Sequence, residues 1–342
     1  MPSILVTGGA GYIGSHTVVE LFRADYKPVI IDNFSNSEKS VLKGIKAITG
    51  ETISLYAGDC NDEQFVKHVF ESEPEITGCI HFAAYKAVGE SVEKPVQYYK
   101  NNINSLLELL SAMLKFNIKN LVFSSSCTVY GQPDDLPVTE SSPVKKAESP
   151  YGNTKQICEE IIKDTVDATG KIKAVSLRYF NPVGAHPTSQ IGELPIGTPN
   201  NLIPFLTQTV AGIREELIIF GDDYNTPDGT CVRDYIHVVD LAKAHVKALD
   251  YLEKEKNDSV YQVFNVGTGN GHTVLDVIKT FELATGEKVK YRIGIRRPGD
   301  IEKVWANADK IYEELNWKAE RTLKQALYDA WNWQKVLKSR GK

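Results

Sequence analysis

The sequence predicts an α/β fold in which a doubly wound parallel sheet is followed by a smaller C-terminal α/β lobe. Three observations lead to this prediction. Short apolar segments alternate with helical patterns over the first half of the 342 residues, as is typical of βαβ units and a parallel sheet. The first apolar segment ends in a glycine-rich turn that opens a helix. After about residue 181 the alternation gives way to a stretch rich in Pro, Gly, Thr and Asn.

The pattern of apolar residues predicts each strand and helix of the first half. Buried parallel strands are short apolar runs, and such runs occur in SILVTGG, PVIIDN, ISLYAGD, GCIHFAA, NLVFSSS and KAVSLRYF. Between them the helical spacing of apolar residues predicts helices near residues 12–23, 38–48, 62–70 and 95–116. A further helix should begin at SPYGNTK, because Ser149 can cap it and Pro150 suits its first position.

The turn TGGAGYIGSH joins the first strand to the first helix. Gly8, Gly11 and Gly14 stand three residues apart in it. Glycines let backbone amides approach a pyrophosphate, and the helix N-terminus favours its negative charge. The spacing differs slightly from the standard dinucleotide fingerprint, but the strand–turn–helix context agrees with it. The first half therefore reads as a Rossmann-type domain.

Two of the predicted strands end in an aspartate that can contact a dinucleotide. Asp32 closes the second strand, where a carboxylate accepts hydrogen bonds from ribose hydroxyls and repels a 2′-phosphate. We therefore expect NAD rather than NADP as the cofactor. Asp59 closes the third strand, and it can either meet the adenine edge or cap the next helix.

The second half has a different organisation. Residues 181–201, NPVGAHPTSQIGELPIGTPNN, have the composition of a long loop, and such loops in compact proteins are usually functional. A helix is expected near residues 202–213 and a short strand at LIIFG. We predict that residues 1–181 form the NAD-binding domain. Residues 182–342 should form mainly a substrate-binding lobe, from which some segments can return to the first domain.

Bulk properties exclude several classes of protein. The chain is 42% hydrophobic and 24% charged, with a net charge of −5 and no long Lys/Arg block, which argues against a nucleic-acid partner. Five widely spaced cysteines without a C-x-x-C pattern disfavour disulfides and a metal site and fit a reducing compartment. No leader pattern opens the sequence, and no apolar run reaches about 18 residues. We expect a cytoplasmic protein with no membrane partner.

Tyr151 and Lys155 stand four residues apart, so a helix places both on one face. By itself this spacing also fits a solvated helical face. If a dinucleotide binds beside Tyr151, the spacing can have a chemical role. A free phenol has a pKa of roughly 10, which is too high for a good base at neutral pH. A lysine ammonium and the positive nicotinamide ring would both lower that pKa, and Tyr151 could then act as a base. A serine among Ser124–Ser126, at the end of the fifth strand, can hydrogen-bond a substrate oxygen.

TGGAGYIGS together with SPYGNTK resembles the extended short-chain dehydrogenase/reductase family. Further motifs extend the resemblance, specifically to the UDP-glucose 4-epimerases of that family, over nearly the whole chain: HFAAYKAVGESVEKP, FSSSCTVYG, RYFNPVGAHP, PNNLIPF, DGTCVRDYIHVVDLA and RRPGDIEKVWAN. The resemblance implies that UDP-galactose and UDP-glucose are interconverted. The sugar would be oxidised transiently at C4 with bound NAD, the 4-keto intermediate would rotate, and hydride would return to its other face.

The resemblance also implies roles for single residues. Tyr151 would remove the proton of the sugar 4-hydroxyl, Ser126 would assist through a short hydrogen bond, and Lys155 would bind the nicotinamide ribose and tune the tyrosine. The implied cofactor contacts are Gly8, Gly11, Tyr12, Ile13, Gly14, Asp32, Asn33, Asn36, Ser37, Asp59, Cys60, Phe82, Ala83, Ala84, Lys86, Asn101, Ser124, Tyr151, Lys155 and Tyr179. The implied substrate contacts are Lys86, Ser126, Tyr151, Phe180, Asn181, Asn201, Leu202, Phe220, Arg233, Tyr235, Arg297, Asp300 and Val304.

Some of the implied substrate contacts have a stated chemistry. Arg233 and Arg297 would bind the pyrophosphate, which suits guanidinium geometry, although either can instead form a surface ion pair. Asp300 would contact the ribose. Val304 would face the C2 substituent of the sugar, where some family members carry a tyrosine that excludes an N-acetyl group. Because valine is smaller, we expect activity also on the UDP-N-acetylhexosamines UDP-GlcNAc and UDP-GalNAc.

The resemblance further implies a homodimer formed by the helices near residues 95–116 and 151–169. The helix near residues 95–116 has one apolar stripe that packs against its own chain. It should expose further apolar surface through four leucines, Leu106, Leu107, Leu109 and Leu110. The alternative is that they are buried within one chain.

Other functions on the same scaffold stay open at this stage. The resemblance implies that a sugar-nucleotide 4,6-dehydratase would carry Asp-Glu directly after the strand-five hydroxyl residue, whereas this chain has Cys127 and Thr128. A redox-sensing regulator without activity is disfavoured because Tyr151, Lys155 and Ser126 are all present. An epimerase for another UDP-sugar, such as a UDP-pentose, is the alternative that the sequence excludes least.

Overall fold

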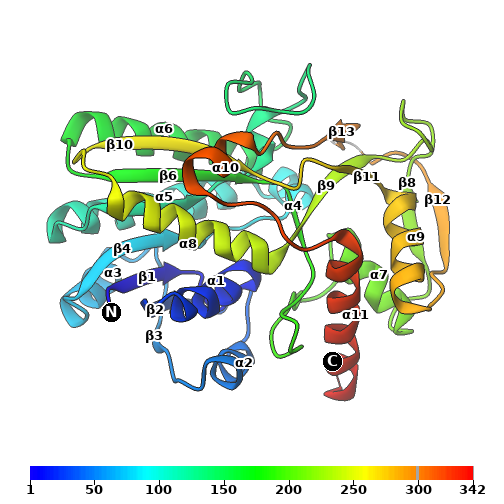
Figure 1. The fold of residues 1–342 in the computed structure, drawn as a ribbon, viewed down its shortest axis with the longest axis horizontal. Helices are drawn as coiled ribbons and strands as arrows, with labels where there is room; N and C mark the ends of the chain where they lie inside the picture. The colour runs from blue at the N-terminus through cyan, green and yellow to red at the C-terminus, as the bar shows by residue number, and fades with distance from the viewer. Residues whose placement is uncertain (298–299, 342) are drawn as a thin grey trace.

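The computed structural model describes residues 1–297 and 300–341. A seven-stranded sheet forms its centre (Figure 1), and every pair of neighbouring strands in it is parallel. Its strands are β1 (Ser3–Thr7), β2 (Lys27–Asp32), β3 (Ser54–Ala57), β4 (Ile76–His81), β5 (Asn120–Ser124), β6 (Lys173–Tyr179) and β10 (Val260–Val266). Their order in space is β10-β6-β5-β4-β1-β2-β3. The order reverses between β1 and β4, which is the switch point of a doubly wound sheet. The predicted fold class is confirmed.

Helices cover both faces of this sheet, and alternate strand residues point to opposite faces. Ile4 and Val6 of β1 belong to one apolar core, whereas Leu5 between them belongs to the other. The first core is closed by α1 (Tyr12–Arg23), α2 (Ser40–Thr49), α8 (Val238–Lys254) and α10 (Asp309–Leu315). The second is closed by α3 (Glu63–Ser72), α5 (Pro95–Phe116) and α6 (Pro150–Thr169).

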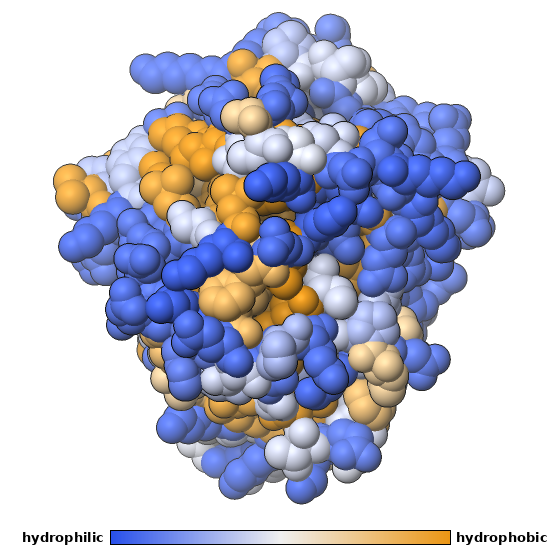
Figure 2. Space-filling view, turned by 90° about the vertical axis from the view of Figure 1, so that its left-hand side faces the viewer, coloured by the Kyte–Doolittle hydropathy of each residue, from blue (hydrophilic) through white to orange (hydrophobic). Residues whose placement is uncertain are grey.

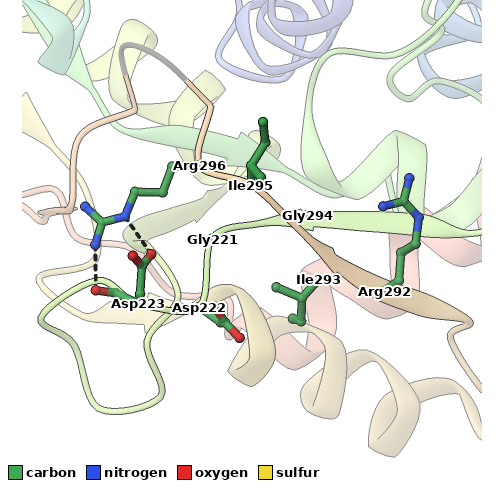
Figure 3. A pocket seen from close by; sticks show the side chains of 8 residues that line it. All are labelled: Gly221, Asp222, Asp223, Arg292, Ile293, Gly294, Ile295 and Arg296. Carbon is green, nitrogen blue, oxygen red and sulfur yellow. Dashed lines mark hydrogen bonds and ion pairs between the residues drawn. The ribbon is translucent and has the colours of Figure 1, made fainter.

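A second, smaller group of elements follows the parallel sheet. It contains a four-stranded sheet of β7 (Asn181–Val183), β9 (Val232–His237), β11 (Gly271–Thr273) and β13 (Lys303–Val304). A strand pair is formed by β8 (Leu217–Phe220) and β12 (Tyr291–Gly294). Both pack against α7 (Leu202–Val210), α9 (Val274–Thr285) and α11 (Leu323–Ser339). Residues 221–223 and 292–296 line a surface pocket beside the strand pair, and Figure 3 shows Arg296 bonded to Asp223 there.

The structure departs from the sequence-based assignment in several places. The predicted loop 181–201 begins with the short strand β7, which pairs with β9 far along the chain. The helix predicted to reach residue 213 ends at Val210, because Gly212 adopts a φ of +78° and turns the chain. A short helix α4 (Val88–Glu93) and a 3-10 helix η1 (Cys127–Tyr130) were not anticipated. Strand β10 joins β6 in the large sheet, while the domain division at residue 181 stays a prediction.

Most of the leucines expected at a dimer interface lie inside the chain. Leu106, Leu109 and Leu110 are 0–3% exposed and belong to the core beneath α5. Only Leu107, which is 41% exposed, reaches the surface. The prediction of free apolar surface was wrong for three of the four, because α5 turns those side chains onto the sheet.

Polar side chains cover most of the face shown in Figure 2, and hydrophobic side chains gather on it in smaller groups. The apolar residues of the chain are therefore largely used in its cores. Within residues 1–297 and 300–341 we find no helix of the length and hydrophobicity that a membrane span requires.

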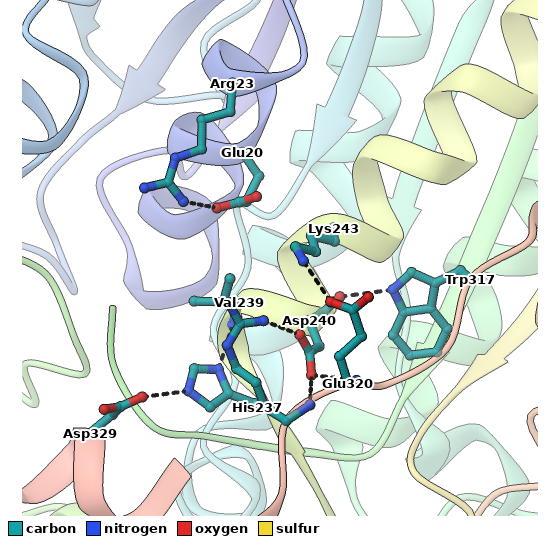
Figure 4. A network of polar contacts seen from close by, with 10 residues as sticks. Glu20, Arg23, His237, Val239, Asp240, Lys243, Trp317, Glu320 and Asp329 are labelled. Atoms are coloured by element: carbon teal, nitrogen blue, oxygen red, sulfur yellow. Dashed lines mark hydrogen bonds and ion pairs between the residues drawn. The ribbon is translucent and has the colours of Figure 1, made fainter. Parts of the chain in front are cut away.

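A buried carboxylate anchors the C-terminal segment to α8 (Figure 4). Asp240 is fully buried and accepts hydrogen bonds from the backbone amides of Glu320 (2.9 Å) and Arg321 (2.7 Å). The Arg321 guanidinium also bonds to it. Trp317 donates from its indole to the Asp240 carbonyl at 3.1 Å. This network fixes the chain between α10 and α11 against the sheet.

Asp240→Ala should destabilise the protein, because it leaves two backbone amides and a guanidinium without their acceptor. We expect a loss of about 3 kcal/mol, measured as a lower urea midpoint. Glu320→Gln is the matched control, since Glu320 pairs with Lys243 at the surface, and exposed pairs contribute at most about 1 kcal/mol. Equal midpoints for the two variants would contradict an anchoring role for Asp240.

Candidate active site

The glycine-rich turn between β1 and α1 leaves no space for side chains. Gly8 has a φ of +69°, and a Cβ there would lie 3.0 Å from the Ala83 amide nitrogen. A Cβ on Gly14 would meet the Gly8 carbonyl oxygen at 2.3 Å. The amide of Gly11 donates to that same oxygen at 3.0 Å. The turn is thus a tight backbone cradle at a helix N-terminus, which fits the pyrophosphate of a dinucleotide.

Asp32 ties the end of β2 to this cradle. Its carboxylate accepts from the amides of Ala10 and Phe34, each at 2.9 Å, and from the Ser37 hydroxyl at 2.8 Å. Asp32 is 7% exposed. A carboxylate has about four acceptor positions, so it can still accept a hydrogen bond from a ribose hydroxyl.

The other predicted cofactor residues follow the carboxyl ends of neighbouring strands. Asn33, after β2, donates to the Asp59 carboxylate after β3 at 3.1 Å. Asn61 links Asp59 to Asn101 of α5. The helix after β3 is capped by Asp62, so the capping alternative for Asp59 is wrong. The remaining residues also follow strands: Asn36 after β2, Cys60 after β3, Phe82, Ala83, Ala84 and Lys86 after β4, and Tyr179 at the end of β6.

Helix α6 buries Tyr151 and Lys155 on the face that meets the end of β5. Ser149 caps the helix as predicted and accepts from the Gly152 amide at 3.1 Å. Lys155 Nζ donates to the Ser124 carbonyl at 2.6 Å and lies 6.0 Å from the centre of the Tyr151 ring. Tyr151, Lys155 and Ser126 are each 4–7% exposed. The interpretation as a solvated helical face is therefore wrong.

Burial dominates the electrostatics of this pair. It raises the pKa of Tyr151 well above 10, although a hydrogen bond with Ser126 acts in the opposite direction. Burial also lowers the pKa of Lys155 to about 8, against the effects of Cys158 and Glu159. Lys155 alone therefore does not produce the predicted lowering of the tyrosine pKa. That lowering requires the positive nicotinamide ring that the prediction also invoked.

The predicted substrate residues other than Lys86, Ser126 and Tyr151 come from five separate segments, and strand pairing brings part of them together. Asn181 of β7 lies opposite Tyr235 of β9, and Val304 of β13 lies opposite Arg233 of β9. Val304 is 2% exposed and packs in one apolar cluster with Phe180. Cys127, beside Ser126, is packed against the same cluster.

The remaining substrate residues lie in two places. Arg297 bonds to Asp300 at 2.7 Å and lies 5.4 Å from the centre of the Phe220 ring. Leu202 starts α7, and the preceding Asn201 donates to Glu193 at 2.8 Å.

Sequence reasoning missed two groups of residues at this site. Glu193 connects two residues that were predicted to bind the cofactor or substrate, because its carboxylate accepts from Asn201 and, at 3.2 Å, from Lys86. No sequence motif identifies Glu193 within the long loop. Glu159 and Arg178 form a buried ion pair beneath Lys155. Glu159 stands four residues after Lys155, so the spacing that identified Tyr151 and Lys155 could also have found it.

Comparisons with known proteins agree with this geometry. The model of the GDP-mannose 4,6 dehydratase family matches residues 5–330. The chain is 50% identical to a UDP-glucose 4-epimerase of Yersinia pestis, over 97% of both chains. It is also 50% identical to one of Bacillus subtilis (strain 168), over 97% of this chain and 96% of the relative.

Two solved structures of UDP-glucose 4-epimerases are similar throughout. The one from Bifidobacterium longum, in complex with NAD+ and UDP, has a TM-score of 0.93 and 47% identity and covers 98% of both chains. The one from Stenotrophomonas maltophila, with bound NAD and formylated UDP-arabinopyranose, has a TM-score of 0.95 and 45% identity over the full length of both. The fold and the tyrosine–lysine pair are those of an extended short-chain dehydrogenase/reductase. Within that class, the chain belongs to the UDP-glucose 4-epimerase family.

Gly14→Ala should strain the cradle, because its Cβ would overlap the Gly8 carbonyl oxygen. We expect a loss of at least about 2 kcal/mol of stability, seen as a lower melting temperature. Gly89→Ala is the matched control, since Gly89 lies in helix α4 with open space around its Cβ position, where alanine should be neutral or stabilising. An unchanged melting temperature for Gly14→Ala would show that the turn is looser than described.

Proposed function

We propose that the protein interconverts UDP-galactose and UDP-glucose with NAD as a permanently bound cofactor. The observation that carries this proposal is the buried set of Tyr151, Lys155 and Ser126 beside the glycine cradle. The names of the relatives and the ligands of the similar structures support it. Bound NAD would supply the hydride acceptor, and then the hydride donor, for C4 of the sugar.

The residues of the chain would prepare that exchange. Tyr151 Oη would take the proton of the sugar 4-hydroxyl and give one back to the 4-keto oxygen, which Ser126 also hydrogen-bonds. Lys155, held by the Ser124 carbonyl, would bind the nicotinamide ribose and favour phenolate through its charge. The glycine cradle would bind the pyrophosphate, and Asp32 the adenine ribose.

The second lobe would hold the UDP part of the substrate. Arg233 and Arg297 suit the pyrophosphate because a guanidinium presents several fixed donors to phosphate oxygens. Asp300 would then exchange its contact with Arg297 for the uridine ribose. Asn181 and Asn201 supply amide groups at the two ends of the long loop.

A second candidate substrate rests on a specific observation. The Stenotrophomonas maltophila structure holds a formylated UDP-arabinopyranose, so a UDP-pentose is the alternative substrate class. Dehydration of the sugar is disfavoured despite the name of the matching family model, because Cys127 and Thr128 follow Ser126 and neither can act as the required carboxylic acid.

We also propose that the enzyme is a cytoplasmic homodimer. The five cysteines are all free thiols, which fits a reducing compartment. Helices α5 and α6 pack side by side, and some of their apolar side chains stay exposed. In α5, Val96 is 78% exposed and Leu107 41% exposed. Ile103 and Ile161 are partly buried. Light scattering that finds a monomer at micromolar concentration would contradict the dimer.

The function is tested by incubating the purified protein with UDP-galactose, without added NAD, and measuring UDP-glucose. The supernatant of heat-denatured protein should contain about one dinucleotide per chain. Parallel incubation with a UDP-pentose ranks the two substrate classes by kcat/KM. Absence of conversion together with absence of NAD would refute the proposal.

Tyr151→Phe should reduce turnover by about 10²–10⁴-fold, the usual contribution of a general base, while retaining the dinucleotide. The substitution removes one hydroxyl and keeps the buried ring. Tyr328→Phe, at a position that is 48% exposed, is the control and should be as active as the wild type. If Tyr151→Phe kept wild-type kcat, another group would have to be the base.

Val304 should set the specificity for the C2 substituent of the sugar. We expect the wild type to epimerise UDP-N-acetylglucosamine as well as UDP-glucose, because a valine side chain is smaller than the tyrosine that would exclude the N-acetyl group. Val304→Tyr should lose the N-acetyl activity and keep activity on UDP-galactose. Volume differences alone discriminate by about 1–3 kcal/mol per methylene, so kcat/KM should shift by at least about tenfold. A wild type inert toward UDP-N-acetylglucosamine would refute this assignment.

A further inference from the structure

Three residues on one face of α6 contact the three consecutive serines at the end of β5. Lys155 donates to the Ser124 carbonyl at 2.6 Å, and Tyr151 shares a hydrogen bond with Ser126. Between them, the Ser125 hydroxyl donates to Glu159 Oε1 at 2.5 Å. Residues 151, 155 and 159 stand four apart, one turn after another. The proposed catalytic tyrosine and lysine therefore share their contact surface with a carboxylate.

Glu159 is held in a fixed position from its other side. Arg178 of β6 donates to Glu159 Oε1 from Nε at 3.0 Å and to Oε2 from Nη2 at 2.6 Å. The two side chains are 7% and 9% exposed. Arg178 in turn lies 4.9 Å from the centre of the Tyr130 ring. A two-point ion pair of this kind restricts both position and rotation of the carboxylate.

The surroundings of Lys155 contain few other charges. On its own helix it faces Tyr151, Cys158 and Glu159, and from the neighbouring strand β4 it faces His81. Burial disfavours the protonated form of His81, whose pKa falls to about 3, so its ring is neutral at neutral pH. The thiol of Cys158 is neutral there as well, because burial raises its pKa to about 11. Glu159 is thus the one carboxylate in this set, and its charge opposes the effect of burial on Lys155.

We propose that Glu159, clamped by Arg178, is a positioning residue that sets the end of β5 against α6 and keeps Lys155 positively charged. It touches neither the sugar nor the cofactor in this role. It acts through Ser125, which lies beside the proposed catalytic Ser126, and through its charge on Lys155. The proposal rests on the function proposed above, in which Lys155 must be an ammonium to favour the Tyr151 phenolate.

Two substitutions separate the charge of Glu159 from its hydrogen bond. Glu159→Gln keeps an acceptor for Ser125 but removes the negative charge, so Lys155 should lose its proton at a pH lower by at least about one unit. The alkaline limb of the kcat profile with UDP-galactose should move down by the same amount, with KM nearly unchanged. Ser125→Ala keeps the charge and removes the bond, so kcat should fall about tenfold at every pH while the limb stays in place.

The titration of Lys155 can be followed without any catalysis. The ¹³Cε resonance of Lys155 in lysine-labelled protein, assigned by its loss in Lys155→Met, reports the midpoint directly. Glu160→Gln is the matched control, because it removes the same charge from the next, exposed position of α6 and should leave the midpoint unchanged. If the wild type failed to convert UDP-galactose, the proposed function would fall while this measurement still tested Glu159.

The outcomes are distinct. A Lys155 midpoint in Glu159→Gln equal to that of the wild type would overturn the electrostatic role, and unchanged kcat in Ser125→Ala would overturn the positioning role. Glu159→Gln leaves Arg178 buried without a counter-charge, which can unfold the protein. The double variant Glu159→Gln/Arg178→Met is compared with Arg178→Met, from which it differs only in the charge at residue 159. Its Lys155 midpoint should lie below that of Arg178→Met, and equal midpoints would overturn the electrostatic role.

Discussion

The contact between the buried face of α6 and the carboxyl end of β5 determines the geometry of the candidate site. The Lys155 ammonium bonded to the Ser124 carbonyl fixes the helix along the strand. With that register set, Tyr151 meets Ser126 and Glu159 meets Ser125. Strand β5 is the neighbour of β4, and the strand order reverses between β4 and β1, where the glycine cradle follows β1. Cofactor cradle and proposed catalytic groups are thereby held by one rigid sheet.

Burial of polar groups has a cost at this site, and the structure offsets it with specific partners. A buried charge is tolerated when hydrogen bonds and an opposite charge replace its water. Glu159 and Asp240 each pair with an arginine, whereas Asp32 is satisfied by two backbone amides and a hydroxyl. Each also joins segments far apart in the sequence. The polar interior therefore specifies which segments meet, while the apolar cores supply most of the stabilisation.

Strand β9 connects the two halves of the molecule. Its Asp234 is fully buried and accepts from the amides of Thr268, Gly269 and Ala306. These bonds bring the turn after β10 and the residues after β13 to one place. The position of Val304 beside Phe180 depends on that arrangement. The buried Asp234 carboxylate thus fixes the backbone beside Val304, the residue proposed to set substrate specificity.

The local patterns of the sequence determined the class of fold and identified candidate residues of the site, to which the family resemblance gave roles. Apolar periodicity, the glycines of the first turn and the four-residue spacing of Tyr151 and Lys155 are properties of neighbouring residues, and they can be read without coordinates. Tertiary structure decided what depends on distant residues. It placed three leucines of α5 in the core, returned β10 to the large sheet and joined Lys86 to Asn201 through Glu193. It also paired Glu159 with Arg178 under the serines. Such contacts depend on how whole elements pack, because burial and partner choice are set by the three-dimensional neighbours of a side chain and not by its neighbours along the chain.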